Sequence, residues 1–178
     1  MSDTDPPTPS EDEHGPPAEP APAAPLEVGV RLAPAADVAE WLREAEAYET
    51  AGAHALWIGD PEPGMDAGAL VAALAAVTYR AMLVLVTARA PEEPVLATIQ
   101  AIGRDRLVVP EAEGVLPEGR RWADVAVPRG RAAWRESLRE AAEAGAVGVV
   151  VPAGPRLLDI LRNPADPEGR QDLHLSFG

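Results

Sequence analysis

From residue 26 onward, short apolar runs alternate along the chain with apolar stripes at helical spacing. The runs predict strands and the stripes predict amphipathic helices, because side chains share a face every 2 residues in a strand and about every 3.6 in a helix. The predicted strands are Leu26–Leu32, Ala55–Ile58, Met82–Thr87, Leu107–Val109, Asp124–Val127 and Val147–Val151, with a possible closing strand in LHLSFG at 173–178. The predicted helices are one behind an Asp37–Glu40 capping box, then Ala69–Val77, Pro94–Ile102, one containing Trp134 and Leu138, and Pro155–Arg162, whereas Ala112–Arg121 is predicted to be a loop.

Two of these helix–strand units follow one template. AGAHALWIGDPEPG begins at Ala51 and AGAVGVVVPAGP begins at Ala144, and in each unit a tryptophan precedes the second-position glycine by 11 residues. Such a repeat indicates a βα architecture. The chain carries five to seven βα-type units within about 150 residues. A complete eight-stranded barrel typically needs roughly 250 residues. The predicted fold class is therefore α/β, a parallel βα barrel of TIM type that is truncated or incomplete.

Composition divides the chain into a tail and one domain. Residues 1–25 hold eight prolines and six acids with no basic or aromatic residue, which predicts a disordered acidic tail before a domain at 26–178. The net charge of −14 disfavours nucleic acid and anionic membranes as partners. No apolar run reaches the roughly 20 residues of a membrane span, and no signal peptide is evident. A cytoplasmic protein is expected.

The chain lacks cysteine and lysine. A thiol nucleophile, a cysteine metal site and lysine-based Schiff-base chemistry are thereby excluded. The three histidines, His14, His54 and His174, are not at metal-ligand spacing, so no metal site is expected. His54 precedes its strand and is expected to be structural, and Trp41 and Trp57 are expected to be core aromatics.

The order of segments from Ala45 to Val109 resembles the luciferase-like flavin-dependent monooxygenases and their deazaflavin-using relatives. The similar pieces are AGAHALWIGD, AGALVAALAAVT with Tyr79-Arg80, MLVLVT, EEPVLATIQAI and DRLVV. The resemblance implies a βα barrel that binds reduced flavin (FMN) or deazaflavin at the C-terminal ends of its strands. The chain departs from the family pattern at Pro61, where a histidine is usual, at Val84-Leu85 in place of Gly-Thr, and at Val109-Pro110-Glu111 in place of a Gly-rich turn.

Four residues are candidates for contact with a cofactor, because they follow predicted strands at the end where ligands bind in parallel sheets. Asp60 follows the second strand, Thr87 and Arg89 the third, and Glu111 the fourth. Thr87 is expected to donate a hydrogen bond to a ligand and Arg89 to hold a phosphate or carboxylate. Each also has a structural interpretation: Asp60 as a turn or cap residue, and the others as polar groups at strand ends.

Two functions therefore remain open. The first is a luciferase-like oxidoreductase or monooxygenase that uses reduced flavin or deazaflavin, acting on an unassigned small-molecule substrate. The alternative is a catalytically inactive, truncated relative that works as a dimeric binding or regulatory protein, an interpretation that the departures favour. Because Ala69–Val77 is apolar at every position, it is expected to be hidden all round, either by the domain or by a second subunit in a homodimer.

Overall fold

A computed structural model describes residues 25–34, 37–89 and 91–164 of the chain. The tail predicted at 1–25, apart from Pro25, and the closing strand predicted at 173–178 lie outside the described residues. The helices are α1 (Val38–Thr50), α2 (Ala67–Val77), α3 (Glu93–Gly103), α4 (Arg131–Glu143) and α5 (Pro155–Arg162), with a short 3₁₀ turn η1 (Pro117–Gly119). The strands are β1 (Glu27–Arg31), β2 (Ala55–Ile58), β3 (Met82–Leu85), β4 (Leu107–Val108), β5 (Val115–Leu116), β6 (Arg120–Asp124) and β7 (Gly148–Pro152).

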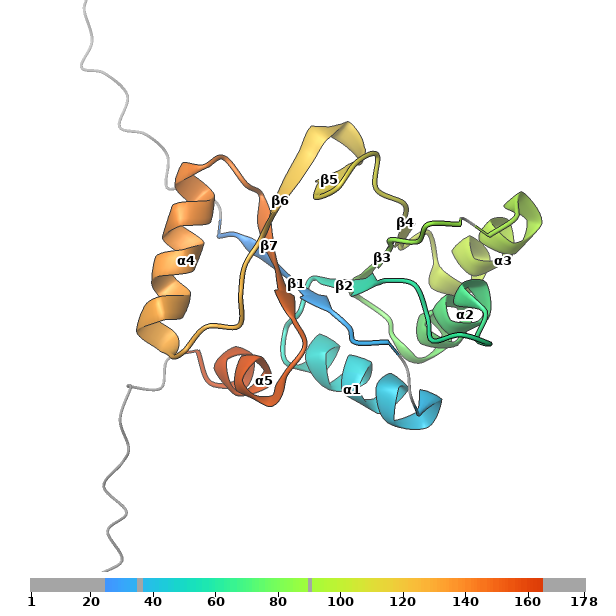
Figure 1. Ribbon diagram of the computed structural model, residues 1–178, viewed down its shortest axis with the longest axis horizontal. Coiled ribbons are helices and arrows are strands. Elements are labelled where there is room, and N and C mark those ends of the chain that lie inside the picture. The colour runs from blue at the N-terminus through green and yellow to red at the C-terminus, as the bar shows by residue number, and fades with distance from the viewer. Residues whose placement is uncertain (1–24, 35–36, 90, 165–178) are drawn as a thin grey trace, which may run out of the picture.

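The strands form one seven-stranded sheet in the order β4-β3-β2-β1-β7-β6-β5. Every neighbouring pair is parallel except β5 with β6. The first strand pairs with the last through five residue pairs, Glu27 with Gly148 to Arg31 with Pro152. The sheet is therefore a nearly closed, barrel-like structure whose two edges are β4 and β5. Figure 1 shows the helices in series along the outer side of the curved sheet, with β5 and β6 at the top of the view.

The two helix–strand units that share a sequence template occupy equivalent places. Their strands, β2 and β7, flank β1 on its two sides. Gly52 and Gly145 both adopt the left-handed backbone conformation, with φ of 98° and 77°, that a helix ending on glycine requires. Trp41 of α1 and Trp134 of α4 are both buried in the outer core between the helices and the sheet. The prediction of two matched units is confirmed.

The sheet is buried on both faces. Its outer face packs under the helices in a large core that includes Val30, Leu56, Leu83 and Val151. Its inner face carries a second, smaller core made of Ala55, Trp57, Val84, Leu116, Trp122 and Val150. Three successive residues of β3, Leu83–Leu85, are almost completely buried, as expected for a strand covered on both sides.

Two tryptophans fill the inner core where a longer barrel would carry layers of branched side chains. The rings of Trp57 and Trp122 lie 5.8 Å apart between centroids and are tilted by 60°. Glycines make the room for them: a Cβ on Gly29 would stand 2.6 Å from Nε1 of Trp57, and one on Gly148 would stand 2.7 Å from Cε3 of Trp122. The curved sheet can therefore hold both rings on its inner face only because Gly29 and Gly148 have no side chain.

The segment between β4 and α4 differs from its prediction. The loop predicted at Ala112–Arg121 contains β5 and η1, and the strand predicted at Asp124–Val127 is β6, four residues earlier. The physical reason is Trp122: with Leu116 it packs into the inner core, and this fixes which residues of β6 face inward. The prediction had placed Asp124 at the beginning of a strand, whereas the structure places it at the end.

Helix α2 is covered largely by its own chain, since α1 and α3 pack along its sides and β3 lies beneath it. It begins two residues before the predicted Ala69, where Asp66 caps it by accepting a hydrogen bond of 2.8 Å from the amide of Ala69. Within Ala69–Val77, Ala69 and Ala76 are exposed. The helix is therefore not hidden all round within the described chain.

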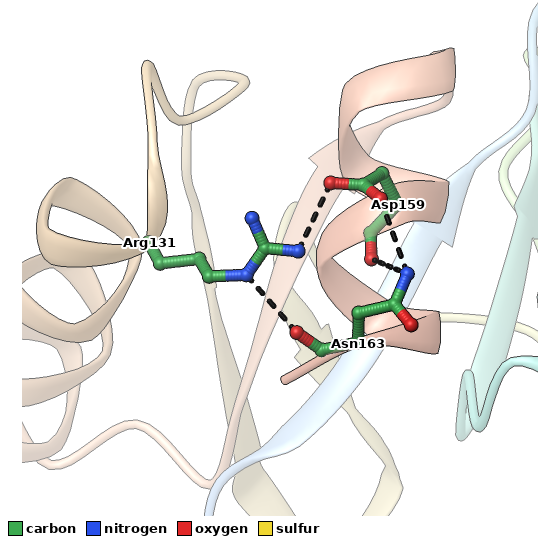
Figure 2. Close-up of polar contacts among 3 residues, drawn as sticks. All are labelled: Arg131, Asp159 and Asn163. Carbon is green, nitrogen blue, oxygen red and sulfur yellow. Dashed lines mark hydrogen bonds and ion pairs between the residues drawn. The ribbon is translucent and has the colours of Figure 1, made fainter. Parts of the chain in front are cut away.

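Polar contacts between helices complete the outer layer. Arg131, the first residue of α4, donates to the carboxylate of Asp159 and to the main-chain oxygen of Asn163, both at 3.0 Å (Figure 2). The guanidinium thus meets the negative end of the α5 dipole. The Tyr48 hydroxyl accepts from the amide of Gly154 at 2.5 Å and donates to its carbonyl at 2.9 Å. This pair of bonds ties α1 to the turn before α5, and burial raises the pKa of Tyr48.

Replacing Gly148 by alanine should destabilise the protein by about 1–3 kcal/mol, the usual cost of forcing an extra group into a packed core. The added Cβ would meet both the ring of Trp122 and, at 2.9 Å, the carbonyl oxygen of Glu27. Gly59→Ala is the matched control, because a Cβ there meets nothing within 4 Å. Chemical denaturation measures both; equal stability of the two variants would contradict this packing.

Candidate functional site

A cavity of about 700 Å³ lies at the C-terminal end of the parallel strands. This volume lies within the range of about 300–1,000 Å³ typical of small-molecule sites. We call it the mouth pocket. Its lining comes from the ends of β1 to β4, from β6 and β7, from the segment that joins β4 to β5, and from one residue each of α1 and α2. In parallel α/β sheets this end collects ligands because the loops that follow the strands converge there.

The wall of the mouth pocket is mainly apolar and aromatic. Three of the four tryptophans of the chain line it, Trp41, Trp57 and Trp122. Trp41 is held in place by a hydrogen bond of 2.9 Å from its Nε1 to the carbonyl of Ala33. The Nε1 atoms of Trp57 and Trp122 are buried and have no hydrogen-bond partner in the structure. A buried indole N–H without an acceptor is uncommon, since most buried polar atoms are paired.

Two of the four predicted site residues come together at the rim. Asp60 follows β2 and Thr87 follows β3, and the Thr87 hydroxyl donates to Oδ1 of Asp60 at 2.5 Å. The amide of Ala88 donates to the same oxygen at 3.1 Å and lies 3.5 Å from Oδ2. Both Asp60 and Thr87 line the pocket. The carboxylate therefore bridges two neighbouring strand ends and keeps Oδ2 largely free for another donor.

The other two predicted residues are not among the residues that line the mouth pocket. Arg89 is exposed and contacts Thr87 through its backbone, where its amide donates to the Thr87 hydroxyl oxygen at 3.3 Å. Glu111 is exposed as well. Its neighbours Pro110 and Ala112 line the pocket instead.

Several residues of this site were not predicted from the sequence, among them Trp41 and Trp57, which were expected only as core aromatics. Arg31 at the end of β1 forms an ion pair with Asp124 at the end of β6, and both line the pocket. Glu113 and Trp122 line it too. The alternation Arg120-Trp122-Asp124 is a pattern typical of a strand and could have indicated β6. It was overlooked because the strand was predicted at Asp124–Val127 instead. Arg31 is the only cation among the described residues that line this pocket, against Asp60, Glu113 and Asp124.

The opposite end of the barrel holds a second cavity of about 600 Å³, whose lining is strongly charged. Several of its charged side chains bind other groups of the protein and so stabilise the fold. Arg120 pairs with Glu27 at 2.7 Å. Arg106 donates to the carbonyls of Ala75, Thr78 and Ala81. His54 accepts a hydrogen bond of 3.1 Å at Nδ1 from the amide of Val28, so its predicted structural role is confirmed.

Glu49 is the most constrained group at this end. Its carboxylate is buried and accepts hydrogen bonds from three successive amides, those of Tyr79, Arg80 and Ala81, at 2.7–2.9 Å. Burial acts to raise the pKa of Glu49, but the three amides and nearby Arg106 outweigh it, so the pKa lies below its ordinary value. The ionised side chain thereby fixes the turn between α2 and β3.

The comparisons with known proteins add no assignment. No model of a known protein family matches the sequence, and no curated protein matches it. Within the described ranges, no group of three or more potential ligand side chains could hold a metal ion. No helix there is both long and apolar enough to cross a bilayer.

Glu49→Gln should destabilise the protein by about 1–3 kcal/mol at neutral pH, because it removes the negative charge that the three amides and Arg106 stabilise and replaces Oε2, which also accepts from the Tyr79 amide at 3.1 Å, by an N–H donor. Since the folded-state pKa of Glu49 is depressed, its contribution is complete above the ordinary value of 4.5 and is lost as pH falls through the folded-state pKa. The difference between wild type and variant should therefore shrink as the pH is lowered below 4.5. Denaturation curves across this range test it; a difference that grows on acidification would contradict it.

Proposed function

We propose that the protein binds a small organic molecule in the mouth pocket. The observation that carries this proposal is the pocket itself, with its volume of about 700 Å³, its tryptophan-lined wall and its polar rim at the ends of parallel strands. Sites for small molecules combine an apolar wall with a few placed polar groups in this way. The proposal agrees with the second of the two predicted functions, a binding or regulatory protein on a barrel scaffold.

A flavin phosphate finds no suitable partner among the described residues of the pocket. Arg31, the one cation in the lining, is already paired with Asp124. The N-terminus of α5 is a second place where a barrel would hold phosphate. There the amide of Gly154 donates to Tyr48 and Pro155 has no N–H to offer, so neither of these two residues provides a donor for phosphate. The described lining of the pocket holds no unpaired cation for the phosphate.

A flavin- or deazaflavin-dependent oxidoreductase is the second candidate. The specific observation in its favour is that Asp60 and Thr87 meet at the rim, at the strand ends where the luciferase-like resemblance implies cofactor binding. This candidate includes the finer fold assignment, a parallel βα barrel of TIM type that is truncated or incomplete. The redox chemistry would belong to the cofactor, and the protein would supply orientation.

Titration with riboflavin and FMN, followed by quenching of tryptophan fluorescence, separates the two candidates. Because the pocket offers the phosphate no partner, riboflavin should bind at least as tightly as FMN. Asp60→Asn should weaken ring binding by about threefold to tenfold, the value of one hydrogen bond. Glu62→Gln is the matched control, since Glu62 is exposed and is not among the residues lining the pocket.

Clearly tighter binding of FMN than of riboflavin would favour the oxidoreductase over the binding protein. No binding of either flavin would exclude a flavin-dependent oxidoreductase, and the protein would then bind some other small molecule.

A homodimer through Ala69–Val77 and a cytoplasmic location stay predictions. Because α1 and α3 already flank α2, the dimer would have to form over the exposed Ala69 and Ala76 together with Val95 and Ile102 of α3, which are 39% and 41% exposed. Light scattering at micromolar concentration measures this directly. A dimer that Ala76→Glu dissociates would support this surface, and a monomer would rule it out.

A further inference from the structure

We infer that the ligand of the mouth pocket is an organic cation, an ammonium group attached to an apolar or aromatic body. The inference rests on the proposed function and names the chemical class of its ligand. It follows from the charges and the aromatic rings that the fold gathers around this one cavity.

The charge balance of the pocket is the first argument. Three carboxylates and one guanidinium are the ionisable groups of its described lining. The Arg31–Asp124 pair neutralises one of the carboxylates, so Asp60 and Glu113 leave the rim with a net negative charge. The whole chain carries a net charge of −14, and a negative field of this kind attracts cations and repels anions.

A free hydrogen-bond acceptor at the rim also favours a cationic ligand. Oδ1 of Asp60 already accepts from the Thr87 hydroxyl and from the amide of Ala88. Oδ2 has only the long 3.5 Å contact to that amide. This oxygen can accept a hydrogen bond from an ammonium N–H. Such a charge-assisted hydrogen bond is about twice as strong as a neutral one. A carboxylate or phosphate ligand would instead meet Asp60 as a like charge.

The aromatic wall is the second, independent argument. Trp41, Trp57 and Trp122 line the same cavity, each with only 4–5% of its surface exposed, and tryptophan is the side chain that attracts cations best through its ring. The remaining wall includes Ile58, Leu70 and Leu85, which suits an apolar body. Acids at the rim and indoles in the wall together form a site for a cation with an apolar body.

A matched set of probes tests the inference on the full chain. Naphthylethylamine, naphthylethanol and naphthylacetate share one aromatic body and differ in charge. By calorimetry, the ammonium should bind about tenfold or more tightly than the alcohol, the gain expected from one charge contact near a protein surface. The carboxylate should bind most weakly. Glu113→Gln should reduce the preference for the ammonium over the alcohol, and Glu62→Gln, which removes an equal charge outside the pocket, should leave it unchanged.

The outcomes separate this inference from the proposed function. Equal binding of all three probes, or tightest binding of the carboxylate, would overturn the organic cation and leave the binding pocket standing. An ammonium preference that Glu62→Gln reduces as much as Glu113→Gln would also overturn it, because the cause would then be net charge alone. Binding of none of the three probes would count against the pocket as a site for aromatic molecules and hence against both.

Discussion

The contact between Trp57 and Trp122 inside the curved sheet is the constraint on which the rest of the structure depends. The sheet has open edges at β4 and β5, so it cannot rely on complete closure to bury its inner face. Two large rings, on β2 and β6, fill that space instead. They fit because Gly29 and Gly148 carry no side chain where the rings lie. The same rings form part of the wall of the mouth pocket, so the packing that stabilises the barrel also shapes the site.

The two ends of the barrel differ in how their polar groups are used. At the N-terminal end, Glu49 accepts hydrogen bonds from backbone amides of the turn between α2 and β3, and Arg106 donates to backbone carbonyls of the same turn. At the C-terminal end, the polar groups pair with each other and remain largely exposed, as in the Arg31–Asp124 ion pair. Exposed ion pairs add little to stability. The mouth is therefore the end at which side chains are available to a ligand, and the opposite end stabilises the fold.

Much of the fold could be predicted from the sequence, because its elements are marked by strong local signals. The cap at Asp37, the left-handed glycines Gly52 and Gly145, and the uninterrupted apolar run of β3 each act within a few residues of the chain. Asp60 and Thr87 could be predicted to lie at the ligand-binding end of the sheet, since they follow parallel strands, although their mutual hydrogen bond was not predicted. These signals needed no knowledge of distant contacts.

The remaining features depend on contacts between residues far apart in the chain. Trp122 packs on Trp57, and this long-range contact, rather than any local pattern, sets the position of β6. With β6 misplaced, Asp124 and its pairing with Arg31, 93 residues away, could not be predicted. The role of Glu49 was hidden for the same reason, because its three donors lie about 30 residues further along the chain.

The most direct test of a ligand site walled by these rings is fluorine NMR of the protein labelled with fluorotryptophan. The chain has four tryptophans, of which Trp134 belongs to α4, is buried in the outer core and is not among the residues lining the pocket. Addition of a bound aromatic ammonium should shift the resonances of Trp57 and Trp122, assigned by single replacement with phenylalanine, and leave Trp134 unchanged. Binding that shifts Trp134 and leaves Trp57 and Trp122 unmoved would contradict a site in the mouth pocket.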